Sequence, residues 1–74
     1  EIHPNPVADE LHFDCPYDHS TIKVINSQGQ VVVHLNDQSA GPASVNIVHL
    51  PEGVYFLQLQ SETAVSSSKF FKKE

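Results

Sequence analysis

Residues that favour β-strands occur in this chain as short runs, and residues that break strands separate the runs at intervals of about 8–12 residues. Val, Ile, Thr, Tyr and Phe fill the runs, whereas Pro, Gly, Asn, Asp and Ser fill the gaps. The predicted strands are residues 11–13, 21–25, 31–35, 43–48, 54–60 and 69–72. The pattern predicts an all-β fold, a small immunoglobulin-like antiparallel β-sandwich of six to seven short strands. A compact open barrel fits the same spacing.

The run at residues 54–60 has the strongest strand pattern. Tyr55 and Leu57 fall on one face, whereas Val54 and Phe56 fall on the other. Apolar residues on both faces predict a central strand of the sandwich.

A hairpin is predicted between residues 21–25 and 31–35, because Gly29 stands in the turn where a positive φ is needed. Two polar loops are predicted further along, at residues 36–42 and 61–68.

Length and charge limit the classes of function. Seventy-four residues make one domain, residues 1–74, with a thin core. The net charge is −5, with four Lys and no Arg, which argues against binding nucleic acid. Three of the four lysines lie in residues 69–74, so we expect a basic terminal strand that acts as a separate recognition element. At the other end, Pro4 and Pro6 predict a stiff, extended segment over residues 1–7 that leads in from a preceding domain.

No residue pattern points to catalysis. The single cysteine, Cys15, is interpreted as a partly buried apolar residue near a strand end. The five histidines include no pair spaced i, i+2 on a strand, so we expect surface histidines and no metal site. The carboxylates fall on strand edges and loops, and the three glycines stand alone. We therefore expect neither an enzyme nor a cofactor.

Three motifs follow one another along the chain: residues 3–7 followed by Leu11, residues 22–32 around a Gly turn, and residues 50–57. Taken in order, they resemble the type A C-terminal sorting domain of the type IX secretion system, and residues 50–57 are similar to that family's Leu-x-x-Gly-x-Tyr pattern. His3, Gln30 and Glu74 depart from the usual family residues. The motif residues expected to be mainly structural are Pro4, Asn5, Pro6, Gly29, Leu50, Gly53 and Tyr55. The residues expected to form the recognition signal are Lys69, Phe70, Phe71, Lys72 and Lys73.

The resemblance implies a C-terminal signal domain that directs a larger N-terminal passenger through the outer membrane. It implies transit through the periplasm of a Gram-negative bacterium and then a location at the cell surface or outside the cell. The implied partners are outer-membrane components of the type IX system and a sortase-like cysteine peptidase, which in many members cuts just upstream of the domain.

Two alternatives follow from the residues alone. An immunoglobulin-like accessory module that binds carbohydrate or mediates adhesion would need a platform of exposed aromatic side chains, for which Tyr17, Phe56 and one of Phe70 and Phe71 are the candidates. A purely structural spacer would tolerate replacement of the terminal lysines. Separately, an uncovered edge strand would allow a dimer.

Overall fold

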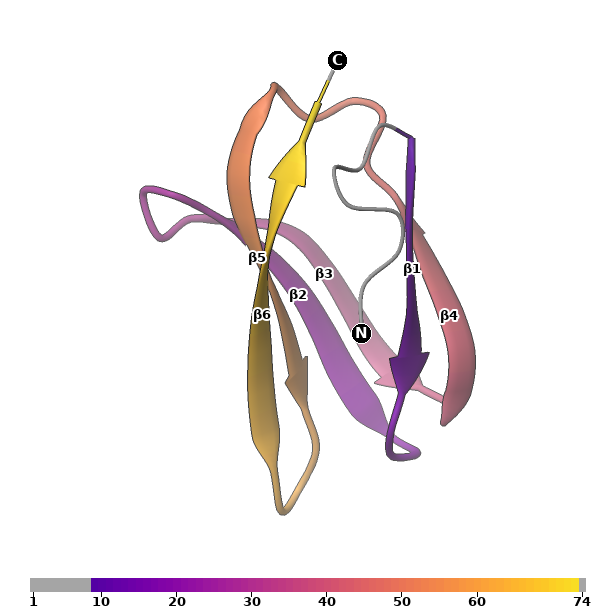
Figure 1. Cartoon of the computed structure of the whole chain (residues 1–74). Helices are drawn as coiled ribbons and strands as arrows, with labels where there is room; N and C mark the ends of the chain where they lie inside the picture. Colours follow the sequence, from indigo (N-terminus) through magenta and orange to yellow (C-terminus); the bar gives the residue numbers. More distant parts are fainter. Residues whose placement is uncertain (1–8, 74) are drawn as a thin grey trace.

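The computed structural model describes residues 9–73, which form six β-strands and no helix. The strands are β1 (Glu10–Cys15), β2 (Ser20–Asn26), β3 (Val31–Gln38), β4 (Gly41–Asn46), β5 (Gly53–Gln60) and β6 (Val65–Lys72). They pair as two antiparallel sheets, β1-β4 and β3-β2-β5-β6 (Figure 1). The predicted antiparallel β-sandwich is confirmed. No helix long and apolar enough to cross a membrane occurs in the described part of the chain.

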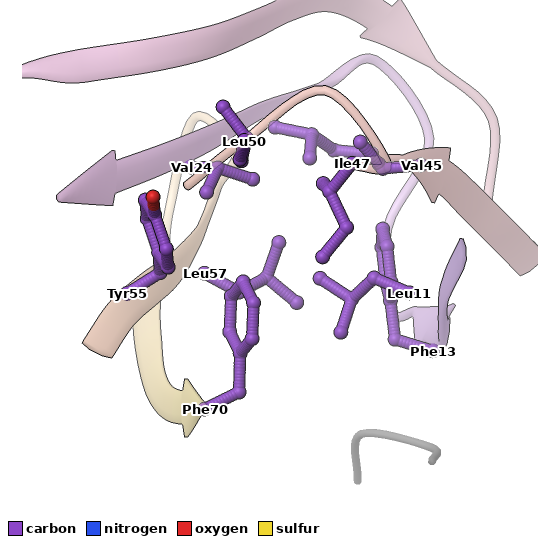
Figure 2. Packing of buried hydrophobic residues seen from close by; sticks show 10 residues of the cluster. Leu11, Phe13, Val24, Val45, Ile47, Leu50, Tyr55, Leu57 and Phe70 are labelled. Atoms are coloured by element: carbon purple, nitrogen blue, oxygen red, sulfur yellow. The ribbon is translucent and has the colours of Figure 1, made fainter. Parts of the chain in front are cut away.

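The core lies between the two sheets and takes the inward side chains of nearly every strand. Buried residues alternate with exposed ones along β1, as the two-residue period of a strand requires. The buried cluster is Leu11, Phe13, Ile22, Val24, Val45, Ile47, Leu50, Tyr55, Leu57 and Phe70. Figure 2 shows the Phe70 side chain of β6 pointing into this cluster, on the same side as Leu57.

β5 is an inner strand of the larger sheet, as its sequence predicts, with β2 on one side and β6 on the other. Tyr55 and Leu57 are buried in the core, whereas Val54 and Phe56 are half-buried on the opposite face. Within residues 9–73, no strand covers that opposite face, because β1 and β4 pack on the core side.

The hairpin between β2 and β3 also follows its prediction. Gly29 has a φ of 85° and donates its N–H to the Asn26 carbonyl oxygen at 3.0 Å. The Asn26 side-chain oxygen accepts the N–H groups of Gln28 and Gln30, each at 2.9 Å. The asparagine therefore organises the turn, and the glycine supplies the backbone conformation that other residues rarely adopt.

Two loop predictions were wrong in extent. β3 continues to Gln38, so the predicted loop at residues 36–42 is mostly strand. The β2–β3 register shifts between Ser20 and Ile22, and Asp37 has a φ of 55°. This local irregularity lets the polar residues at the end of β3 remain part of the strand.

The predicted loop at residues 61–68 is likewise too long, because β6 begins at Val65. Ser66, Ser67 and Ser68 pair with Leu59, Gln58 and Leu57 of β5. Serine is not among the residues enriched in strands. On an edge strand, however, serine stays exposed to water while the neighbouring strand supplies the backbone hydrogen bonds.

Candidate functional site

Four of the residues expected to form the signal lie on β6 and the fifth, Lys73, follows it, and their side chains alternate between the two faces. Lys69, Phe71 and Lys73 are exposed, whereas Phe70 and Lys72 are buried at 2% and 3% exposure. The five residues therefore do not form one continuous basic surface. Only the three exposed ones are open to contact with another molecule.

The position of β6 is set by its pairing with β5. The ladder runs from Gly53 opposite Lys72 to Gln60 opposite Val65. Tyr55 is the register partner of Phe70, and their rings stack with centroids 5.8 Å apart. The terminal strand is thus a packed element of the sheet.

Lys72 reaches into the fold and stays close to the backbone. Its Nζ donates a hydrogen bond to the Lys73 carbonyl oxygen at 2.9 Å. The ammonium group thus makes one hydrogen bond, to the backbone of the next residue.

The motif at residues 50–57 holds the start of β5, directly beside the end of β6. Leu50 is buried in the core, and its N–H bonds to the Ile47 carbonyl oxygen at 3.0 Å. The Tyr55 hydroxyl donates to the Pro51 carbonyl oxygen at 2.6 Å, closing the turn that enters β5. The structure thus brings together Leu50, Gly53 and Tyr55 with the terminal strand. Gly29 lies apart from them in the β2–β3 turn, and Pro4, Asn5 and Pro6 lie outside the described residues.

Sequence reasoning missed a polar contact that ties two loops together. The Asp18 carboxylate accepts the Ala40 N–H at 2.8 Å and so joins the β1–β2 loop to the β3–β4 turn. Nothing in the local sequence marks this carboxylate, because its partner is a backbone group 22 residues away.

The four described histidines are all exposed: His12, His19, His34 and His49. His19 Nδ1 lies 2.6 Å from Asp37 Oδ1. The Asp37 carboxylate raises the pKa of His19, first through this hydrogen bond and then through its charge. Among residues 9–73, no three His, Cys, Asp or Glu residues are grouped so as to hold a metal ion.

Cys15 is 3% exposed at the end of β1, and its Sγ donates to the Tyr17 carbonyl oxygen at 3.3 Å. This placement fits the structural role expected for it, and leaves the thiol without access to a substrate.

One apolar cavity of about 190 Å³ lies at the end of the sandwich that holds the β1–β2 and β5–β6 connections. Tyr17, Leu59 and Ser66 contribute to its lining. Ser66 and Phe71 are five residues apart on one strand, or about 17 Å. Tyr17 and Phe71, which are 49% and 41% exposed, therefore lie at different ends of the domain and form no common platform for a sugar.

The family model described as "Secretion system C-terminal sorting domain" matches residues 1–73. No curated protein matches the chain.

Proposed function

This chain belongs to the family of type IX secretion system C-terminal sorting domains, and we propose that it delivers an N-terminal passenger across the outer membrane through contacts made by its terminal strand. A sorting signal for type IX secretion is what the family provides, and the family is not one of enzymes. The passenger first reaches the periplasm and then the cell surface or the medium. The domain itself does no chemistry.

The observation that carries the proposed contact is the alternation along β6. Lys69, Phe71 and Lys73 are exposed on this strand and next to it. They would meet an acidic surface of an outer-membrane component, with the lysines steering the encounter. Phe70 and Lys72 would act indirectly, because their buried side chains fix the position of the exposed three.

Backbone groups offer a second contribution. Among the described strands, β6 pairs only with β5, so one edge of β6 is free for strand addition. The receptor would add a strand there. Without the receptor, the same edge would allow two copies of the domain to pair.

After transport, a sortase-like cysteine peptidase would cut upstream of the domain. Residues 1–7, which include Pro4 and Pro6, would lie beside the cut. The reaction would belong to the peptidase, and the domain would contribute only recognition and spacing.

The test is export of a reporter fused upstream of residue 1, in cells that have the type IX machinery. Deleting residues 69–74 would also remove the core residue Phe70, so substitution of exposed residues is the cleaner change. The double variant Lys69→Gln/Lys73→Gln lowers the net charge by two and leaves the core intact. We expect wild-type melting of this variant and clearly reduced surface reporter.

The matched control, Ser44→Glu/Thr63→Glu, lowers the net charge by the same two at exposed positions outside β6. It should be exported like the wild type. A wild-type fusion that stays in the periplasm would overturn the sorting function itself. Equal export of both double variants would overturn the role of the exposed lysines.

A further inference from the structure

The outer face of the four-stranded sheet carries a continuous apolar row at the end near the last residues of β6. The register places Val31, Ile25, Phe56 and Lys69 side by side across β3, β2, β5 and β6. Val54 and Phe71 form the adjoining pair.

These apolar side chains do not belong to the core. The ones that belong to this surface are Ile25, Val31, Val54, Phe56 and Phe71, and none is in the buried cluster or among the half-buried side chains packed against it. Val31 is 51% exposed and Phe71 is 41% exposed. Single exposed apolar residues are ordinary, but a connected set on one sheet face is typical of a binding surface.

Positive charge flanks this row. Lys69 is the register neighbour of Phe56, and Lys23 lies opposite Gln58 one step further along the same face. Strands β2, β5 and β6 contain no Asp or Glu, although the chain as a whole has a net charge of −5. The one carboxylate of β3, Asp37, lies at the far end of that strand against His19.

We propose that this outer face, from Val31 on β3 to Lys69 on β6, is a docking surface for a protein of the secretion machinery that presents an apolar centre with acidic residues beside it. The inference rests on the proposed sorting function and extends its contact surface from β6 to the whole sheet. The apolar row would contact apolar side chains at the centre of the partner's surface, and the two lysines would pair with carboxylates beside them. The negative charge of the rest of the domain opposes binding to a broad anionic surface and so favours a partner with locally placed acids.

The dimensions fit a brief encounter. Three strand spacings separate Val31 from Lys69, or about 15 Å, and Val54 to Phe56 spans about 7 Å along β5. A patch of this size is comparable to the energetic centre of an interface, which a rim of weaker contacts surrounds. A cargo signal that must leave its receptor needs such a limited contact.

The test uses residues of this face that lie outside β6, so that the terminal strand stays unchanged. Phe56→Thr removes a half-buried aromatic from the row but keeps a residue that favours strands. Lys23→Gln removes only the charge. In the reporter fusion, each is expected to lower surface delivery about tenfold, the effect of losing one significant interface contact.

Val48→Thr and Ser44→Glu are the matched controls. Val48 is 57% exposed after β4, and Ser44 is exposed on β4, so both lie outside the four-stranded sheet. Both should be exported like the wild type. Thermal melting of all four variants checks that each domain is folded, and Lys23→Gln serves as the decisive change if Phe56→Thr unfolds.

The two hypotheses fail differently. Wild-type export of a folded Lys23→Gln domain would overturn the docking surface and leave the sorting function standing. Equal losses of surface delivery in Val48→Thr and Phe56→Thr would also overturn the docking surface, because the effect would then not be specific to this face. Failure of the unsubstituted domain to export its reporter would overturn the sorting function.

Discussion

The rings of Tyr55 and Phe70 stack across the β5–β6 ladder, with 5.8 Å between their centroids and 23° between their planes. Tyr55 belongs to the family motif and Phe70 to the terminal segment, so the pair joins the two parts of the sequence that most resemble a sorting domain. The motif residue thus helps to fix the position of the strand on which the proposed signal residues lie.

Replacing Phe70 with alanine should therefore destabilise the whole domain. The side chain is 2% exposed, and truncating a buried phenylalanine costs about 3–5 kcal/mol. A domain of this size has little stability to lose, so we expect a large fall in the melting temperature. Circular dichroism of the variant checks this. Phe71→Ala, at the exposed neighbouring position, is the control and should melt close to the wild type.

Tyr55→Phe tests the hydroxyl separately from the ring. It keeps the stacking but removes the hydrogen bond to the Pro51 carbonyl oxygen, which measures 2.6 Å. We expect a loss of about 1 kcal/mol in the free energy of unfolding. A denaturant midpoint identical to that of the wild type would show that the hydroxyl does not stabilise the turn before β5.

The sequence predicted the regular strands well, because side chains that alternate between core and water leave a two-residue period. The sequence-based prediction failed where pairing with a neighbouring strand determines that a segment is a strand. Ser66–Ser68 contain no apolar signal, and they are strand only because β5 lies alongside them. The polar end of β3 was missed for a similar reason, since the irregularity at Asp37 depends on pairing with β2.

The residues expected to form the signal do not share one surface. A basic cluster such as residues 69–73 shows no periodicity strong enough to separate inward from outward positions. The Lys72 side chain points inward because it lies on the same face of β6 as Phe70. The packing of Phe70 depends in turn on Tyr55, 15 positions earlier in the chain. The outer apolar row was also not visible, because it forms only when four strands take their register.

The turn at Gly29 provides a local test of backbone strain. Its φ of 85° lies in the region that residues with a side chain adopt at a cost. No atom lies near the position of an added Cβ, so the cost is conformational and not steric contact. Gly29→Ala should lower the stability by about 1–2 kcal/mol. Ser27→Ala in the same exposed turn serves as the comparison, and equal denaturant midpoints would contradict the argument.

The His19–Asp37 pair predicts a pH-dependent contribution to stability. The pKa of His19 in the folded state is raised above its ordinary value of 6.5 by the Asp37 carboxylate. A raised folded pKa means that the stabilisation is fully present below pH 6.5 and is lost as the pH rises through the folded pKa. Both side chains are mostly exposed, at 83% and 74%, so salt should weaken the effect.

An NMR titration of the His19 ring measures this directly. In Asp37→Asn the pKa of His19 should fall towards 6.5, and the change of stability across this pH range should shrink. An unchanged titration of His19 in that variant would show that Asp37 is not the cause.

A substitution at Lys72 tests whether its charge is needed for stability of the fold or for recognition by a receptor. Its ammonium is buried and hydrogen-bonded only to the carbonyl oxygen of Lys73 among its described contacts. Lys72→Met keeps a linear apolar stem and removes the charge. Because a buried ammonium loses hydration that one carbonyl replaces only in part, we expect the melting temperature to stay the same or rise.

Export should then persist in Lys72→Met, since Lys69, Phe71 and Lys73 keep their exposed positions. The reporter fusion checks this beside the Lys69→Gln/Lys73→Gln variant, which we expect to fail. A stable Lys72→Met domain that is not exported would mean that the receptor reads the Lys72 ammonium itself. Since this group lies on the core side of β6, reading it would require the end of β6 to separate from Gly53 and the start of β5. Recognition would then proceed by opening the sheet and not by docking onto its surface.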